Sequence, residues 1–383
     1  MFKKLLITLS VLLMAGAAFA GDADWSFYGV AHASLNMLNN GNDSQLGLSS
    51  NTSRFGFKGT APMNEEFTAF WQFESLLDVA GNGDGTVIGT RNTFVGMKHE
   101  TAGKLVFGRH DTPFKTLGRK VEVFPDQIGD FRATTMGWDN RLGEIIAYVS
   151  PDWDGFSIFA AYQFDQGDIM DKADDNYEAL TAMSAMAAYQ TEQFMIGAAY
   201  EAASSGYGDT DEDGNYSDGP KAFRLAAKYF GEKFDIGAMY QSATNQYYDG
   251  TGFADDTYTD MGVGACFKVS PKWNVKGQYY MANIWTDAED DAETTDIDEG
   301  DWKAGQLTFG VERVFTENVL CYLQYSMISN GEGNVDGSDF YDDYTLHVGG
   351  GQSGFGDSTS GSYDNSGKWQ DPSGFSVGTV ITW

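Results

Sequence analysis

The stretch NTSRFGFKGT, residues 51–60, sorts its side chains between two surfaces if it forms a β-strand. Successive side chains of a strand point to opposite faces, so Arg54 and Lys58 share one face while Phe55 and Phe57 share the other. One face suits water and the other suits an apolar environment. Whether that environment is a protein core or a lipid depends on the rest of the chain.

The composition favours many short strands over helices. The 383 residues include 47 Gly, 27 Phe, 20 Tyr and 9 Trp but only 7 Pro. Aromatic residues and glycine with few long aliphatic runs are typical of all-β proteins.

The first 20 residues predict a secretory signal. Two lysines precede an apolar run over residues 5–15, and a small-x-small cleavage sequence occupies residues 18–20. The alternative is an N-terminal anchor, but the run is shorter than the roughly 20 residues that a spanning helix needs. We therefore predict a cleaved signal over 1–20 and a single mature domain over 21–383. Because no later run approaches that length, membrane insertion requires a closed β-barrel.

The charge is strongly acidic and unevenly distributed. Removal of the signal takes away two lysines and no acids, so the formal net charge of -31 becomes -33. Such a chain repels polyphosphate, which argues against nucleic acid as a partner. Acidic residues crowd three stretches, which we interpret as loops: 165–178, 209–218 and 287–301.

Alternating polarity defines 16 segments of about ten residues each, the usual length of strands that cross an outer membrane. Short connections such as 191–192 and 231–232 alternate with long acidic or glycine-rich ones. This pattern predicts an all-β fold, a 16-stranded antiparallel transmembrane β-barrel. A soluble two-sheet sandwich is the alternative, and the apolar outer stripe disfavours it. The segments are 26–37, 51–61, 65–77, 90–100, 103–110, 141–150, 155–164, 181–190, 193–203, 220–230, 233–243, 258–269, 272–285, 303–315, 317–328 and 373–383.

The connection over residues 110–140 differs from the acidic loops. Sixteen strands enclose a lumen too wide for side chains to fill, so the interior is an aqueous channel unless a segment folds into it. This connection mixes acids and aromatic residues with four bases, and a loop of this length in a compact fold is usually functional. We predict that it folds inward. The bases are Lys115, Arg119, Lys120 and Arg132.

Three short stretches carry a resemblance to a known family. SRFGFKG at 53–59, RNTFVGM at 91–97, FGRHDTPFK at 107–115 and the aromatic residue that ends the last strand resemble the Gram-negative general porins, in order and spacing. The resemblance covers the chain from the signal to Trp383. It implies an outer-membrane homotrimer of barrels for passive diffusion of ions and small hydrophilic solutes. In that family the third loop folds inward and opposes its acids to arginines on the wall.

The resemblance implies wall residues of a constriction. Arg54 and Arg91 match the family's wall arginines, and Arg141 matches less closely. Lys58 shares the inner face of Arg54, and His32 lies in the first strand, FYGVAHAS, where a valine stands at a position that is basic in many relatives. The simpler interpretation of each charge is a lumen-facing residue that only solvates the wall.

The acids of the inward loop would be Glu122 and Asp126, with Asp130 as a third candidate. Wall cations and loop anions create a field across the path that orients dipolar solutes and penalises apolar ones. Filtering is then by size, charge and polarity, and no covalent step is needed.

The last strand is the second element that the resemblance marks. Phe375 and Trp383 lie on the same face of residues 373–383. In the family the barrel assembly machinery reads the terminal strand through its final aromatic residue. A tryptophan also suits the membrane interface.

Motifs for catalysis and metal binding are weak. GFSVG at 374–378 matches G-x-S-x-G but lies inside a strand, and the glycine pattern at 349–354 does not open a helix, so we predict no enzyme. Asp209, Asp211 and Asp213 match the first half of a calcium-loop pattern, but a proline stands where the last ligand belongs, so an unspecialised acidic loop is the alternative. We expect no cofactor beyond loosely bound Ca²⁺ or Mg²⁺, shared with lipopolysaccharide phosphates.

Two alternatives to an open diffusion channel remain. A substrate-selective channel would bind a sugar or another solute on aromatic rings of the lumen or the third loop. A surface receptor or adhesin would rely on the long final extracellular loop, 329–372. The rings are Phe114, Phe124, Phe131 and Trp138.

The two cysteines, Cys266 and Cys321, lie on separate, non-consecutive strands, and alternation places them on opposite faces. We therefore predict two free thiols and no disulfide.

Overall fold

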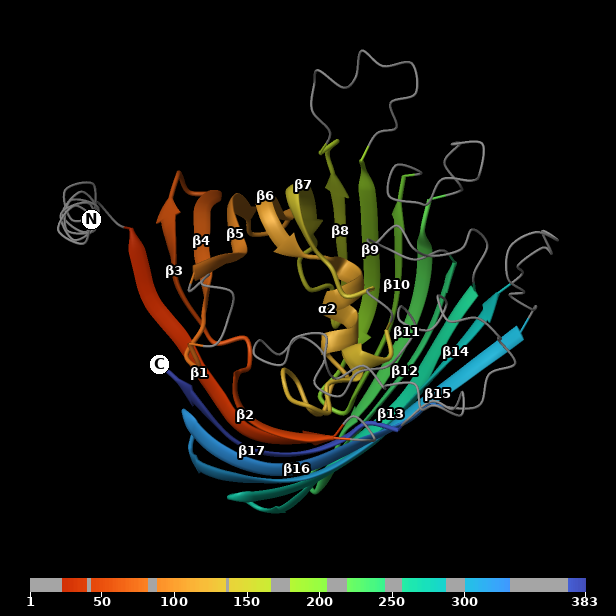
Figure 1. Cartoon of the computed structure of the whole chain (residues 1–383). Helices are drawn as coiled ribbons and strands as arrows, with labels where there is room; N and C mark the ends of the chain where they lie inside the picture. The colour runs from red at the N-terminus through yellow and green to blue at the C-terminus, as the bar shows by residue number, and fades with distance from the viewer. Residues whose placement is uncertain are drawn as a thin grey trace.

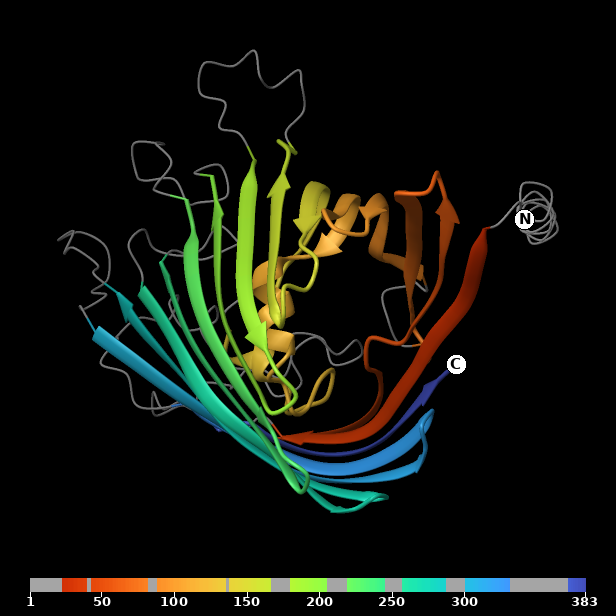
Figure 2. The ribbon, with the colours of Figure 1, turned by 180° about the vertical axis from the view of Figure 1, so that it is seen from behind.

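A single antiparallel sheet closes on itself in the computed structural model of the chain. Figures 1 and 2 show the strands standing side by side around a central space, with both ends of the sheet brought together. The described residues are 23–39, 43–81, 88–135, 138–166, 180–204, 219–244, 257–286, 300–330 and 371–383.

From β3 to β17 each strand pairs with the next, and β1 pairs with β2, β3 and β17, so the sheet closes on itself. The strands are β1 (Asp24–Asn39), β2 (Ser44–Ser50), β3 (Arg54–Pro62), β4 (Phe67–Leu77), β5 (Ile88–His99), β6 (Gly103–Asp111), β7 (Arg141–Val149), β8 (Phe156–Gln163), β9 (Ala182–Gln190), β10 (Phe194–Ala203), β11 (Lys221–Phe230), β12 (Phe234–Thr244), β13 (Thr257–Ser270), β14 (Trp273–Thr286), β15 (Gly300–Thr316), β16 (Val319–Asn330) and β17 (Ser373–Thr382).

Strands β2 and β3 are two pieces of one membrane span. Both pair with β1, and the chain leaves the ladder between them at residues 51–53. With this pair counted once, the 17 strands make 16 spans, which confirms the predicted barrel. The predicted start of this span at residue 51 was too late. The real span begins at Ser44, because SQLGLSS alternates outward leucines with polar residues that also resemble a turn.

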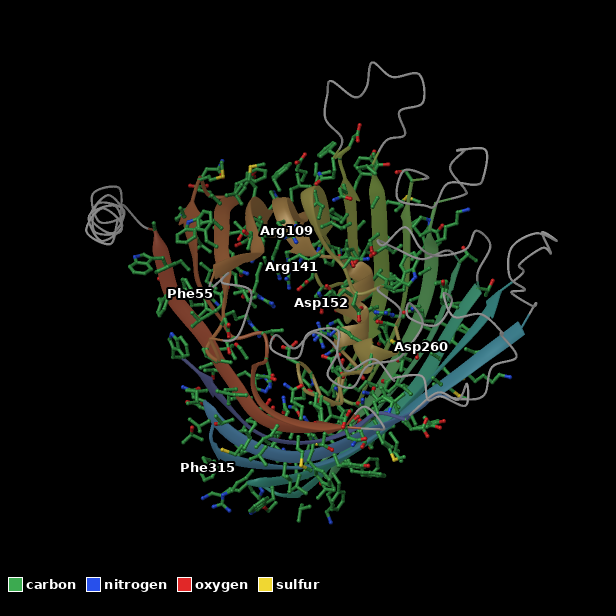
Figure 3. The ribbon with its side chains drawn as sticks, viewed as in Figure 1. Phe55, Arg109, Arg141, Asp152, Asp260 and Phe315 are labelled. Carbon is green, nitrogen blue, oxygen red and sulfur yellow. The ribbon has the colours of Figure 1, made fainter. Side chains whose placement is uncertain are left out.

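The outer face of the barrel is apolar. Phe27 is 47% exposed and packs its ring 5.1 Å from that of Phe57. Figure 3 shows Phe55 and Phe315 pointing away from the barrel. A continuous exposed apolar surface of this kind is what a barrel presents to lipid. The face of Phe55 and Phe57 thus meets lipid, and the face of Arg54 and Lys58 looks into the barrel.

The two ends of the barrel differ. Short turns join β3 to β4, β5 to β6 and β9 to β10, and the start of β1 and the end of β17 lie at this same end. In barrels of the outer membrane the short turns are periplasmic and the long loops extracellular. Backbone hydrogen bonds run both ways between Gly29 and Trp383, at 3.1 and 3.2 Å, and they close the ring at this end.

The connection from β6 to β7 carries two short helices inside the barrel. Helix α2 (Pro113–Arg119) begins after Thr112, whose side chain accepts a hydrogen bond from the Lys115 backbone N–H, and a proline occupies its first turn. The 3₁₀ helix η1 (Phe131–Ala133) follows. Figures 1 and 2 both show α2 within the ring of strands, so the predicted inward fold of the third loop is present. Among the described residues, no helix is long and apolar enough to cross a membrane.

Cys266 and Cys321 are free thiols, as predicted. The Cys321 thiol lies 3.5 Å from the Thr379 hydroxyl on the neighbouring strand.

Candidate constriction site

The inward loop, residues 112–140, packs against one wall of the barrel, formed by β9 to β15. Glycines on that wall make room for it. A β-carbon at Gly237 would collide with Val121, and one at Gly264 would collide with Val123. The loop therefore contacts the strand backbone closely, as glycine permits.

The aromatic residues of the loop face this wall and not the lumen. Phe114, Phe124, Phe131 and Trp138 are each no more than 1% exposed. The ring of Phe131 stacks on Tyr280 with centroids 5.1 Å apart. Because these rings are covered, they form no stacking path for a sugar. The alternative of a substrate-selective channel that binds a sugar on these four rings is therefore not supported.

Arg224 of β11 binds the inward loop on the side that packs against the strands. Its guanidinium is completely buried, pairs with Asp139 at 2.8 Å and donates to the backbone oxygen of Phe114 at 3.1 Å. It also lies over the Phe114 ring, 4.0 Å from the centroid. A buried guanidinium satisfied by a carboxylate, a carbonyl and a ring is a strong, specific anchor. The sequence analysis missed this residue, although its alternation already placed it on the inner face.

Further side chains hold the loop backbone at several points along its length. The Lys228 ammonium donates to the carbonyl of Lys120 at 3.0 Å. Wall glutamines donate to other loop carbonyls: Gln241 to Thr135 at 3.2 Å, Gln306 to Ile128 at 3.4 Å, and Gln278 to Gly129. The loop is thus fixed to several neighbouring strands.

The three predicted loop acids form one cluster with two arginines of the same loop. Arg119 contacts Glu122, Asp126 and Asp130 at 3.2, 2.9 and 3.0 Å. Arg132 contacts Asp126 at 3.0 Å and Asp130 at 2.7 Å. Glu122 and Asp130 are almost completely buried, whereas Asp126 keeps some exposure. The structure therefore brings the three acids together, but Glu122 and Asp130 are buried within the loop and do not face the lumen.

Burial and charge act in opposite directions on these acids. Burial alone would raise the pKa of Asp126 and Asp130, but Arg119 and Arg132 outweigh it and hold both pKa values below their usual range. Burial raises the pKa of Glu122 well above its ordinary value, and the charge of Asp130 adds to this effect. Asp126 also has a positive φ of 58°, which is uncommon for a non-glycine residue.

Asp126 joins the loop to the opposite wall. Its carboxylate lies 3.7 Å from the Arg54 guanidinium. Arg54 is also 3.9 Å from Glu74, and Arg91 forms a closer pair with the same Glu74 at 2.8 Å. Of the predicted pairs of opposed charges, the contact between Arg54 and Asp126 is the one that the structure brings together.

Arg141 lies on the same wall, on β7. It pairs with Asp111 at 2.9 Å and donates to the Asn92 side-chain oxygen at 2.8 Å. Lys115 contacts Asp111 as well, at 3.1 Å. The wall acids Glu74 and Asp111 were absent from the sequence predictions, and only their place on the inner face could have indicated them.

Arg109 is a further wall arginine that the sequence analysis missed. It faces Thr93 across the β5–β6 ladder and makes no ion pair with any described residue. Figure 3 shows Arg109 and Arg141 on the inner side of their strands. The bulge beside Arg109 shifts the register, so simple alternation does not predict its direction.

Two predicted wall residues lie elsewhere. The His32 ring is 4% exposed, and its Nε2 lies 2.9 Å from the Tyr322 hydroxyl. It points inward but is covered, so it does not contact the open lumen. Lys58 lies 5.0 Å from the centroid of the Tyr28 ring and makes no contact with the inward loop among the described residues. It belongs to a separate group of lysines near the periplasmic end.

The predicted assembly residues both face outward. Phe375 is 48% exposed and packs its ring 4.6 Å from that of Tyr325. The Trp383 ring covers Gly29 and lies 6.3 Å from the ring of Phe27. Both rings are therefore available at the surface that meets lipid.

The predicted calcium residues Asp209, Asp211 and Asp213 lie outside the described residues, as do the signal and most of the final loop. Within the part of the chain that the structure describes, no group of three His, Cys, Asp or Glu residues has a metal-binding arrangement. GFSVG at 374–378 lies within β17, with no helix after it in the described part.

A closed antiparallel barrel with an apolar outer face and a charged loop folded into its lumen defines a β-barrel membrane protein of the porin type. The profile of the Gram-negative porin family matches residues 8–334, which is most of the chain. The chain therefore belongs to the Gram-negative porin family, and it is a protein of the outer membrane.

Curated relatives match over part of their length. The major outer membrane protein P.IB of Neisseria sicca is 30% identical over 173 residues, 42% of this chain and 47% of that protein. Outer membrane porin protein 32 of Delftia acidovorans is 28% identical over 187 residues, 45% and 52% of the two chains. The chain spans about half the length of the curated relatives it matches.

Solved structures match over nearly the whole chain. An anion-selective porin from Comamonas acidovorans superposes with a TM-score of 0.71 at 19% identity, over 94% of this chain and 100% of that one. Salmonella typhi OmpF in complex with daunomycin gives a TM-score of 0.65 at 18% identity, over 94% and 97%. At these identities the likeness shows the fold.

Proposed function

We propose that the protein forms a water-filled channel for passive diffusion of ions and small hydrophilic solutes across the outer membrane. The observation that carries this proposal is the contact between Asp126 of the inward loop and Arg54 of the opposite wall, at 3.7 Å. Opposed charges this close, one on the inward loop and one on the wall, support a charged constriction. Opposed charges across a throat orient dipolar solutes and penalise apolar ones.

The wall beside this contact is rich in arginine, with Arg54, Arg91, Arg109 and Arg141 contributed by neighbouring strands β3 to β7. Guanidinium groups stay charged at every physiological pH, so this wall attracts anions at all times. Glu74 and Asp111 offset part of that charge. The proposed selectivity therefore depends on a small surplus of positive charge over one side of the throat.

The test is the current of the refolded protein in a planar bilayer, followed by the reversal potential in a salt gradient. The variant Arg54→Ala/Arg91→Ala removes two cations and leaves Glu74 unpaired, so we expect a clear shift toward cation preference. The control Arg54→Lys/Arg91→Lys keeps both charges and should stay near the wild type. A wild type that folds in the bilayer but carries no current contradicts the proposal and favours a receptor.

We infer the partners from the same architecture. A homotrimer is expected because general porins assemble in this way, and current steps in groups of three would support it. We further propose that the signal is cleaved after residue 20 and that the barrel assembly machinery recognises Phe375 and Trp383. The acidic loops would contact lipopolysaccharide through Ca²⁺ or Mg²⁺. Catalysis has no role in this proposal.

A further inference from the structure

Two lysines face each other on the inner wall near the periplasmic end. Lys98 of β5 pairs in register with Lys104 of β6. Their neighbours Met97 and Leu105, also paired, are exposed on the outer face, so both lysines project inward. Side chains directly opposite on one face approach within about 5 Å, and like charges in this arrangement repel each other.

A third lysine lines the same space. Lys58 of β3 borders, together with Lys98 and Lys104, a cavity of about 490 Å³. The rings of Phe70 and Phe94 form part of its lining, with centroids 6.1 Å apart. We name this cavity the lysine vestibule. It combines three ammonium groups with an apolar floor.

The lysines of the vestibule lack counterions. None of the three forms an ion pair with a described residue, and no shared carboxylate lies between them. Asp24 is the acid in the lining of the cavity, and it pairs with none of them. Several other cations of the lumen are compensated, as Lys276 is by Glu312 at 2.5 Å. In a chain with a formal net charge of -31, an uncompensated cationic site is unusual.

A lysine at the rim of a barrel is ordinarily solvated and needs no ligand. Three features go beyond that interpretation: the direct cross-strand pairing of two lysines, the convergence of a third on the same cavity, and the aromatic floor beneath them. Repulsion between the ammonium groups is relieved when an anion lies between them. The rings supply contact area for a carbon skeleton, which an inorganic ion does not use.

We propose that the lysine vestibule binds a small organic anion with at least two negative charges, such as a dicarboxylate, at the periplasmic mouth of the lumen. The proposal rests on the proposed function, because an open channel supplies the solute to this site. Binding is weak and reversible, since a channel site must release what it binds. The site lies apart from the constriction and concentrates anions beside it.

The experiment uses succinate as the probe and the refolded full-length protein. Succinate should reduce the wild-type single-channel current in a saturable way at low ionic strength, and uncharged succinamide should not. For Lys98→Gln/Lys104→Gln we expect the succinate affinity to fall about tenfold. The matched control is Lys233→Gln/Lys272→Gln, which removes two lysines from short turns at the same end, away from the vestibule. It should keep the wild-type affinity.

Calorimetric titration of succinate into the protein in detergent gives a second measurement that does not depend on current. Heat of binding in the wild type that is lost in Lys98→Gln/Lys104→Gln supports the vestibule even if no current flows, an outcome that contradicts only the proposed function. Equal affinity loss in both double variants, or no binding by the wild type, overturns the vestibule. Heat-modifiable mobility on a gel verifies that each variant folds.

Discussion

The constriction and the lysine vestibule lie in the same lumen, but the cations of the constriction are mostly paired with carboxylates and those of the vestibule are not. At the constriction, Arg119 and Arg132 are enclosed by three carboxylates, and Arg91 has its own partner in Glu74. In the vestibule, the lysines have no carboxylate within ion-pair distance among the described residues. Compensated charges fix geometry, whereas uncompensated ones attract mobile ions. The difference indicates that the loop cluster mainly holds the shape of the throat.

The largest effect is expected from the anchor of the loop. Arg224→Ala leaves Asp139 buried without its partner, which should cost about 3–5 kcal/mol of loop docking. The loop then leaves the wall, and the channel becomes wider and noisier. Single-channel conductance measures this change directly. Lys228→Ala, which removes a half-buried cation that donates to one carbonyl, is the matched variant and should change conductance far less. Equal conductance in Arg224→Ala and the wild type would show that other contacts suffice.

The next largest effect is a difference in barrel stability between two variants, one that removes a paired wall arginine and one that removes an unpaired one. Arg91→Ala leaves Glu74 without its closest partner and should destabilise the barrel by about 1–3 kcal/mol. Arg109→Ala removes a cation with no ion pair, so stability should stay within about 0.5 kcal/mol of the wild type. Both should shift the reversal potential toward cations. Thermal unfolding in detergent distinguishes them, and equal losses of stability would refute the assigned pairing.

A smaller effect is the pH dependence of loop docking. The lowered pKa values of Asp126 and Asp130 contribute stability at pH values above their ordinary 3.8, and this contribution is lost as the pH falls further. The raised pKa of Glu122 acts in the opposite sense, because the folded state binds the proton more tightly. Docking therefore weakens as the pH rises above 4.5, the ordinary pKa of a glutamate such as Glu122. We expect maximal docking between about pH 3.8 and 4.5, measured by fluorescence of the buried Trp138 or by proteolysis.

The variant Glu122→Gln tests this explanation. Its side chain does not titrate, so docking should no longer weaken with rising pH, while the loss at low pH remains. A slope above pH 4.5 that persists in this variant would assign the titration to another group.

The smallest effect concerns divalent ions at the outer loops. If acidic loops share Ca²⁺ or Mg²⁺ with lipopolysaccharide, EDTA should lower the melting temperature of the assembled protein by a few degrees, as expected for weakly bound ions (about 1 kcal/mol). The vestibule should be unaffected, so succinate binding serves as the control. An unchanged melting temperature would remove metal ions from the proposal.

The sequence predicted the barrel well because a period of two residues decides which face each side chain takes. The segments 181–190 and 233–243 match β9 and β12 closely, and Arg54 and Phe55 lie on the predicted faces. The same rule does not extend to the partners of a side chain inside the lumen. Periodicity places Glu74 on the inner face without indicating that it pairs with Arg91, which is distant in the sequence.

The inward loop shows the same limit. Glu122 and Asp130 lie in the charged cluster of this loop, where they pair with Arg119 and Arg132 of the same loop. These pairs form because the loop bends back on itself, and a bend without strand or helix periodicity is not predicted by alternation. The bulge beside Arg109 and the covered position of His32 have the same cause: local departures from regular pairing redirect side chains.

The reciprocal bonds between Gly29 and Trp383 join residues that are far apart in the sequence, so we expect them to form late in folding. The residues that close the ring come from opposite ends of the chain, so the entropy of loop closure is nearly the largest that the chain can have. Until the last residue arrives, the first strand has an open edge that attracts other strands. Insertion is therefore expected to be slow and to finish at this seam, and a chain without its final residues should remain an open, aggregation-prone sheet.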